Sequence, residues 1–306
     1  MFGLLLFALA IIPSPTNVHC NGGEVPGTSF APFDVAINQV VDKSVECEGY
    51  VLQIEPTGVT IRSSDESGAF YARKTLEQIV DWRGYPCMTI SDSPAYHWRG
   101  MLFDDARHFF GKNTLKKTLD LMSQYKLNVL HWHLVDDQGW RLDIPGLPEL
   151  VRYGAVRVAS PKHGASVRWI DKANEKYTFD LDGEKCGPFF YTEADVREIV
   201  DYAKQRHIKV VPEIEFPGHV YAMLAAHPEL ACVPENLSAR SPRLIWGIEK
   251  DVLCLGNDES IRIMERCLIM YAAYSHLMSF TSGGMSAHRT GGGRALNAKR
   301  EFGKRV

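Results

Sequence analysis

Carboxylates, an arginine and a histidine directly follow three short apolar runs of this sequence. The three sets are Asp104 with Arg107, Asp136 with Asp137, and Glu213 with Glu215 and His219. A histidine beside a carboxylate is held in one tautomer and made more basic, and an arginine offers a fork of donors to sugar hydroxyls or to a carboxylate. These side chains therefore predict a polar site that could bind a hydroxylated ligand and handle a proton.

The apolar runs themselves indicate buried strands that alternate with helices. Strands are expected over residues 100–104, 128–134 and 208–214. Asn113 can cap a helix that carries Leu115, Leu119 and Met122 along one face. Thr192 with Asp195 resembles a capping box, and opens a helix whose apolar residues are Val196, Ile199, Val200 and Ala203. Repeated units of this kind imply a parallel sheet, open or closed into a barrel, with the chemistry at the carboxyl ends of the strands.

A small α+β domain is predicted ahead of these units, over residues 21–93. Residues 50–54 and 59–62 alternate in polarity and are joined through Pro-Thr-Gly, which indicates a β-hairpin. A helix is expected over residues 68–80, and residues 91–94 have the composition of a linker.

The first residues, MFGLLLFALAII, form an apolar run that is short for a membrane span. We interpret residues 1–20 as a signal peptide, although the run has no preceding Lys or Arg and no clean cleavage site. A wrongly assigned start codon is the alternative. We expect a protein of the secretory pathway, secreted or lysosomal, in which Asn236-Leu237-Ser238 is a glycosylation acceptor.

Composition and charge exclude several classes of function. The 45% hydrophobic share can build a sizeable core, and the formal net charge of -3 gives no general attraction to nucleic acid or anionic lipid. Six cysteines follow Cys20 without C-x-x-C spacing, so a zinc site is not predicted. In an oxidising compartment some of these cysteines would pair. We expect no nucleic-acid partner and no membrane span, and the oligomeric state is left open.

Three longer motifs carry a resemblance to a known family. They are RGMLFDDARHFF (residues 99–110), KLNVLHWHLVDDQGWRL (residues 126–142) and VVPEIEFPGHVYAMLAAHPEL (residues 210–230). In order and spacing they resemble the family 20 glycoside hydrolases, the β-N-acetylhexosaminidases. The resemblance extends over residues 50–267 and implies an α/β fold. We therefore expect the first three βα units of a TIM barrel over residues 94–267, behind the small α+β domain.

The resemblance implies exo-hydrolysis of terminal β-linked N-acetylglucosamine or N-acetylgalactosamine with retention, the substrate's acetamido oxygen acting as nucleophile. It implies a carbohydrate partner and neither metal nor cofactor. By motif position Arg107 would bind hydroxyls of the terminal sugar, and Asp136 and His219 would form a relay beside the general acid. Supporting roles fall to Arg99, Asp104, Asp137, Trp140 and Glu215. Glu215 stands where the family usually has Asp, so its role is left open.

The family's general acid lies in a motif that reads HIGGDE, and this sequence does not contain it. Residues 268–306 instead turn rich in Gly, Lys and Arg. Codons permitted for residues 280–288, read from the third base of each, can encode HIGGDECP. We therefore expect a frameshift near residues 267–270, an aberrant tail over residues 268–306 and no catalysis by this polypeptide. A genuine basic extension is the alternative.

Two other classes of function are kept open. A non-catalytic carbohydrate-binding relic would use Arg107, Asp136 and Trp140, and would bind N-acetylglucosamine without turnover. A barrel hydrolase for a different sugar would resist a thiazoline mimic of the oxazolinium intermediate.

Overall fold

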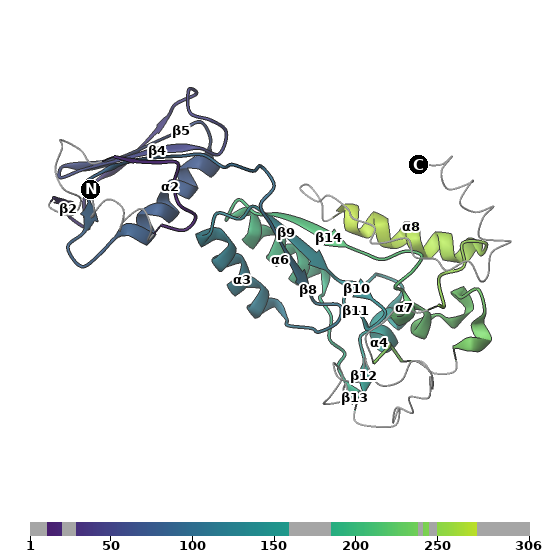
Figure 1. Ribbon diagram of the computed structural model, residues 1–306. Coiled ribbons are helices and arrows are strands. Elements are labelled where there is room, and N and C mark those ends of the chain that lie inside the picture. The colour runs from purple at the N-terminus through teal and green to yellow at the C-terminus, as the bar shows by residue number, and fades with distance from the viewer. Residues whose placement is uncertain (1–10, 20–28, 159–184, 238–240, 245–249, 274–306) are drawn as a thin grey trace, which may run out of the picture. The chain divides into compact units, whose positions relative to one another are not determined.

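The computed structural model describes residues 11–19, 29–158, 185–237, 241–244 and 250–273 (Figure 1). The chain forms two compact units. The first holds residues 1–101 together with 118–129 and 204–208, and the second holds the remainder. Among the helices that the structure describes, none combines the length and the apolar character needed to cross a bilayer.

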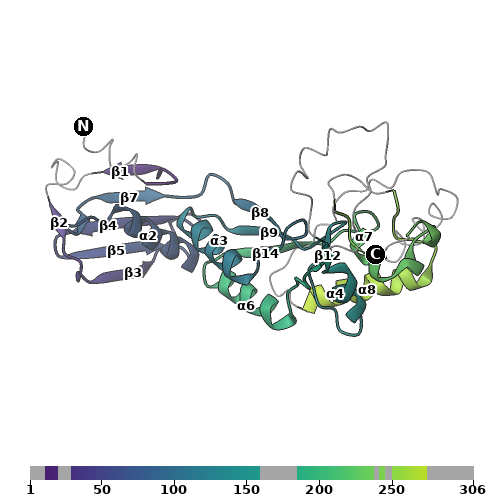
Figure 2. The same ribbon diagram turned by 90° about the horizontal axis from the view of Figure 1, so that it is seen from below.

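A five-stranded sheet organises the first unit, in the order β1-β7-β4-β5-β3 (Figure 2). Its strands are β1 (Asn17–His19), β3 (Ile37–Val41), β4 (Tyr50–Glu55), β5 (Gly58–Ser63) and β7 (Thr89–Asp92). A separate short pair joins β2 (Phe30–Ala31) to β6 (Tyr85–Pro86). The predicted hairpin is confirmed, because β4 and β5 pair antiparallel with Glu55 opposite Gly58.

Helix α2 (Glu66–Ile79) packs on this sheet through its apolar face. Alternate residues of β4, Leu52 and Ile54, are fully buried and meet the helix side of the sheet, as a strand period of two requires. The helix begins two residues before the predicted residue 68, because Asp65 caps it by accepting a hydrogen bond of 2.8 Å from the Gly68 amide.

The folded unit extends to the N-terminal side of the boundary predicted at residue 20. Strand β1 pairs with β7, with Val18 opposite Ile90. Ile11 is also part of the core of this unit, where it is 1% exposed. Residues 1–10 lie outside the described part of the chain, and cleavage of a leader stays a prediction.

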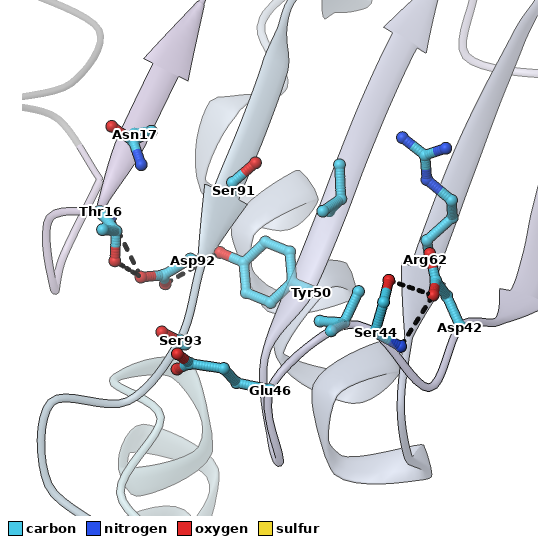
Figure 3. Close-up of a pocket in the computed structure, with 12 residues that line it drawn as sticks. Thr16, Asn17, Asp42, Ser44, Glu46, Tyr50, Arg62, Ser91, Asp92 and Ser93 are labelled. Atoms are coloured by element: carbon cyan, nitrogen blue, oxygen red, sulfur yellow. Dashed lines mark hydrogen bonds between the residues drawn. The ribbon is translucent and has the colours of Figure 1, made fainter.

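The first unit contains a buried ion pair between Lys126 and Asp92. Lys126 Nζ lies 2.9 Å from Asp92 Oδ2, and the two side chains are 6% and 11% exposed. The Tyr50 hydroxyl donates to the same carboxylate and lies 2.7 Å from the Thr75 hydroxyl. Asp92 also borders a shallow polar hollow of about 430 Å³, where Thr16 donates to its other oxygen (Figure 3). Burial lowers the pKa of Lys126, and the charge of Asp92 opposes that shift.

Three strands, in the order β14-β9-β8, form a second sheet, and the predicted site residues lie at or just after the ends of these strands. The strands are β8 (Gly100–Asp104), β9 (Val129–His133) and β14 (Lys209–Glu213). The Val129 amide donates to Arg99 O, and the Asp105 amide donates to His133 O, so β8 and β9 advance in the same direction. Leu134 N donates to Glu213 O at the same ends of β9 and β14. The predicted parallel arrangement is therefore confirmed.

Helices α3 (Lys112–Gln124) and α6 (Glu193–Lys204) connect these strands. The capping box of α6 is confirmed, since Thr192 and Asp195 exchange side-chain to backbone hydrogen bonds in both directions. The cap predicted for α3 is wrong. Helix α3 begins at Lys112, which places Asn113 inside its first turn, although Leu115, Leu119 and Met122 are buried as expected.

Short elements fill the rest of the second unit. They are β10 (Val135–Asp136), β11 (Gly139–Trp140), α4 (Pro148–Gly154), β12 (Arg157–Val158), β13 (Lys185–Cys186), α7 (Tyr221–Ala226), η2 (Pro228–Leu230), η3 (Pro234–Asn236) and α8 (Asp258–Ala273). Most of the predicted aberrant tail, residues 274–306, lies outside the described residues, as does Ser238 of the predicted glycosylation triplet.

The buried ion pair generates a stability prediction. Asp92→Asn keeps the shape of the side chain but leaves the Lys126 ammonium buried beside a neutral amide, so we expect a loss of about 3 kcal/mol in the free energy of unfolding. The measurement is urea unfolding of the full chain. Asp81→Asn is the matched control, because Asp81 pairs with Arg83 near the surface and the substitution should leave the free energy of unfolding nearly unchanged. Equal losses in the two variants would contradict a special role for the buried pair.

Candidate functional site

The site is built around the carboxylate of Asp136, which follows β9 and is 1% exposed. Arg107, in the turn after β8, places Nη2 2.6 Å from Asp136 Oδ2 and Nη1 3.0 Å from Asp104 Oδ2. Asp104 also accepts from the main-chain amide of Arg107 at 3.1 Å. One guanidinium therefore joins the acids that end two neighbouring strands.

His133, the last residue of β9, contacts both members of the Arg107–Asp136 ion pair. Arg107 Nη1 lies 2.9 Å from Nδ1 of the imidazole, and Nε2 lies 2.9 Å from Val135 O. Because an arginine N–H only donates, this contact requires the neutral tautomer with its proton on Nε2. Burial opposes protonation, but the hydrogen bond to Asp136 and the charge of Glu213 outweigh it and raise the pKa of His133.

His219 approaches the same carboxylate from the turn after β14. Its Nδ1 lies 3.3 Å from both Asp136 Oδ1 and Asp137 Oδ2. The residue has φ of 53°, in the left-handed region that residues with a Cβ rarely adopt. A strained backbone at this position is consistent with a ring held in place for a functional reason.

The two adjacent aspartates titrate in opposite directions. Burial would raise the pKa of Asp136, but His133 and Arg107 stabilise its charge and bring that pKa below the usual range. Asp137 is fully buried, and burial together with the neighbouring Asp136 charge raises its pKa despite the hydrogen bond from the Tyr221 amide. Asp136 is therefore the charged member of the pair.

A second pair of acids ends β14. Glu213 Oε2 lies 2.7 Å from His131 Nε2 and 3.4 Å from His133 Nδ1. Glu215 is 4% exposed, and burial with the hydrogen bond to Glu213 raises its pKa well above the usual range. The extra methylene of Glu215 thus places a carboxyl group that favours its protonated form next to Glu213.

A buried hydrogen-bond network fixes the turn that carries Arg107. The Asp105 carboxylate, fully buried, accepts from Trp132 Nε1 at 2.7 Å, the Tyr191 hydroxyl at 2.8 Å and the Phe110 amide at 2.9 Å. Arg141 donates to the carbonyl oxygens of Asp105 and Ala106. Because the carboxylate and the carbonyls on either side of the turn are all satisfied, the turn has one preferred conformation.

Six of the predicted site residues come together at the carboxyl ends of the strands. They are Asp104, Arg107, Asp136, Asp137, Glu215 and His219. Arg99 does not join them: it lies at the amino end of β8, where it pairs with Glu48 at 2.8 Å and donates to Lys126 O. Trp140 is fully buried, and its indole N–H donates to Leu142 O at 2.6 Å, so it supports the fold and presents no surface to a ligand.

Sequence reasoning left His133, His131 and Asp105 out of the site. The signal for the histidines was present, because residues two apart in a strand point to the same face and both precede Asp136. No comparable signal marked Asp105, whose partner Tyr191 is 86 residues away.

Two sets of three side chains have the spacing of metal ligands. One is His133, Asp136 and Glu215, and the other is Asp136, Asp137 and His219; each has ligand atoms within 4.8 Å of one another. Both sets need Asp136, whose charge Arg107 already neutralises at 2.6 Å. The absence of a bound metal stays a prediction.

The arrangement suits recognition of hydroxyls together with control of a proton. Arg107 is a fixed fork whose acidic partners hold it in place, and the charged Asp136 faces two imidazoles. A histidine between carboxylates can hold or pass a proton near neutral pH.

Two family models match the chain. Residues 22–93 match "Glycosyl hydrolase family 20, domain 2", and residues 96–286 match "Glycosyl hydrolase family 20, catalytic domain". The match to the catalytic domain alone extends over more than half of the sequence.

Individual relatives are similar over long stretches. A β-hexosaminidase of Porphyromonas gingivalis is 38% identical over 228 residues, which is 71% of this chain and 26% of the relative. A β-hexosaminidase of Akkermansia muciniphila is 36% identical over 251 residues, which is 80% of this chain and 45% of the relative. The chain thus spans less than half the length of either.

Solved structures are similar in fold. The crystal structure of a β-N-acetylhexosaminidase superposes with a TM-score of 0.79 at 29% identity, over 97% of this chain and 59% of that one. A mutant Streptomyces plicatus β-hexosaminidase in complex with its product N-acetylglucosamine gives a TM-score of 0.74 at 28% identity, over 97% of this chain and 62% of that one. The mixed α/β fold of the present chain corresponds to an N-terminal domain and part of a TIM barrel.

The contacts of His133 predict its titration. Because the folded-state pKa is raised, the stabilisation from the imidazolium is present below about pH 6.5 and is lost as the pH rises through the folded-state value. Asp136→Asn removes the carboxylate that contributes most to raising the pKa of His133, so this pKa should fall. NMR titration of the imidazole, assigned with His133→Gln, measures it. Glu193→Gln, at an exposed ion pair with Arg197, is the control and should leave the pKa of His133 unchanged. If Asp136→Asn also left that pKa unchanged, Asp136 would not be the cause of its rise.

Proposed function

The chain belongs to glycosyl hydrolase family 20, and from this premise we propose that its polar site binds the terminal N-acetylhexosamine of a glycan. The corresponding activity is exo-hydrolysis of terminal β-linked N-acetylglucosamine or N-acetylgalactosamine. The relatives named β-hexosaminidase support this activity, as does the Streptomyces plicatus structure with N-acetylglucosamine.

One observation carries the proposal. Arg107, which is partly exposed, and the buried Asp136 come from the ends of two different strands and form an ion pair of 2.6 Å, and His133 and His219 converge on the same carboxylate. A carboxylate that only stabilised the fold would not need three polar side-chain partners at the carboxyl edge of a parallel sheet, which is where barrel enzymes bind substrates.

The residues present have distinct roles in the proposed reaction. Arg107 binds hydroxyls of the terminal sugar, and its orientation is set by Asp104 and Asp136. Asp136 stays charged and orients His219, which handles the proton of the general acid. In this family the acetamido oxygen of the substrate attacks the anomeric carbon, so the protein needs no nucleophile of its own.

The HIGGDE motif, which carries the general acid in this family, does not occur in this sequence. The sequence therefore offers no residue at the family position of the general acid. We therefore propose that the polypeptide as printed binds the amino sugar without hydrolysing it. The family activity would require the acid and the partner that orients the acetamido group.

We propose export of the protein to the outside of the cell or to a lysosome. The apolar residues 2–12 and the Asn236-Leu237-Ser238 triplet support this proposal. Detection of a glycan on Asn236 in protein purified from its native source would test it, and a chain retained intact in the cytosol would contradict it.

Sugar binding is the direct test of the site. Titration of the full chain with N-acetylglucosamine should show saturable binding, and Arg107→Lys should weaken it roughly tenfold, about 1.4 kcal/mol, because an ammonium cannot replace the planar fork. Isothermal titration calorimetry measures both. The matched control is Arg197→Lys, at an exposed i,i+4 pair with Glu193, which should bind as the parent does. Absence of binding, or an equal effect of both variants, would remove the proposed sugar site.

Turnover is tested separately with an aryl N-acetyl-β-glucosaminide. We expect no release of the aryl group above the buffer rate by the polypeptide as printed. If release occurred and Asp136→Ala abolished it, the general acid would have to lie among residues of this chain, and our account of the missing acid would be wrong. Inhibition of such turnover by a thiazoline would further identify the acetamido group as the nucleophile.

A further inference from the structure

We propose that Cys232 and Cys254 form a disulfide, next to residues that contact the turns of the site. This inference concerns covalent chemistry of the second unit and does not depend on the proposed function.

An isolated antiparallel bridge brings the two cysteines together. Ala231 pairs with Leu253, and the Cys254 amide donates to Leu230 O at 2.8 Å. Cys232 and Cys254 each follow a bridge partner, so they lie diagonally across the antiparallel bridge, and they share one face because side chains alternate along paired strands. Cys254 is also a side-chain neighbour of the Cys232 thiol and contributes to the raised pKa of that thiol.

Both thiols are accessible to a small oxidant. Cys232 is exposed and Cys254 is partly exposed, whereas Cys267 is buried. Partial burial and the contact with Cys254 raise the pKa of the Cys232 thiol. Since the thiolate is the reactive form, the pair should oxidise slowly at neutral pH and faster in mildly alkaline buffer.

Two described residues between the cysteines, Arg243 and Leu253, contact turns that carry site residues. The Leu253 amide donates to Pro217 O at 2.9 Å, two residues before His219. The Arg243 amide donates to Asp137 O, also at 2.9 Å. A covalent link between residues 232 and 254 would restrict the backbone next to Leu253, and would thereby stabilise the contact of Leu253 with the turn that carries His219.

The chemistry requires an oxidant, for which a low-molecular-weight disulfide such as oxidised glutathione is sufficient. One protein thiolate attacks a sulfur of the glutathione disulfide, forms a mixed disulfide and releases one glutathione thiolate. The second protein thiolate attacks the protein sulfur of the mixed disulfide and releases the other. The released thiolates take up the two protons, so the protein loses two electrons and glutathione disulfide gains them.

Peptide mapping of the full chain tests the link. The chain is incubated in oxidised glutathione at mildly alkaline pH, alkylated and digested with trypsin without reduction. Trypsin separates the two thiols, because cleavage after Lys209, Arg240, Lys250 and Arg262 leaves them on residues 210–240 and 251–262. Mass spectrometry should find these two peptides linked, with the loss of two hydrogens. The oxidised chain should also melt several degrees above the reduced chain.

Three variants make the outcome decisive. Cys232→Ser should abolish the linked peptide and the rise in melting temperature, whereas Cys47→Ser and Cys186→Ser, at two other exposed thiols, should leave both unchanged. If Cys232 instead remained in a mixed disulfide with glutathione, or linked to Cys47 or Cys186 while Cys254 was alkylated, the proposed disulfide would be excluded.

Discussion

The structure of the second unit depends on one buried charge, the carboxylate of Asp136. Removing a carboxylate from water costs several kcal/mol, and a carboxyl group without partners would become neutral instead. Asp136 keeps its charge because Arg107 lies 2.6 Å away and because His133 and His219 face its two oxygens. Arg107 and His219 come from the turns after β8 and β14, and His133 is the last residue of β9, so the charge of Asp136 connects three strand ends.

The parallel sheet makes this convergence possible. Strands β8, β9 and β14 end at one edge, which brings Asp136 and His219, 83 positions apart in the sequence, to within 3.3 Å of each other. A guanidinium can neutralise a buried carboxylate only if its own turn is fixed, and Asp105 supplies that restraint through Trp132 and Tyr191. The long side chain of Arg107 is therefore ordered by the fold before any ligand arrives, which lowers the entropy that binding would cost.

The sequence contained enough information to predict the strands, the helices between them and most of the site. Apolar runs that stop at acids located β8, β9 and β14, and the Thr192–Asp195 pair located the start of α6. It could not separate the two ends of a strand by motif alone: Arg99 and Asp104 occur in one motif, yet only Asp104 reaches the site. Trp140 illustrates a similar limit, since an aromatic residue beside acids resembles a sugar platform until its burial is known.

The carboxyl groups around Asp136 cannot all be charged at such short separations, and the arrangement of cations decides which one is. Arg107 contacts Asp136, whereas Asp137 and Glu215 are buried beside other acids, and their pKa values are raised for that reason. Neutral carboxyl groups donate hydrogen bonds, so Asp137 and Glu215 can stabilise the charged acids next to them instead of repelling them. On this basis the longer side chain at position 215 is compatible with the site: it adds a proton donor near Glu213 and leaves the charge on Asp136, where the relay to His219 requires it.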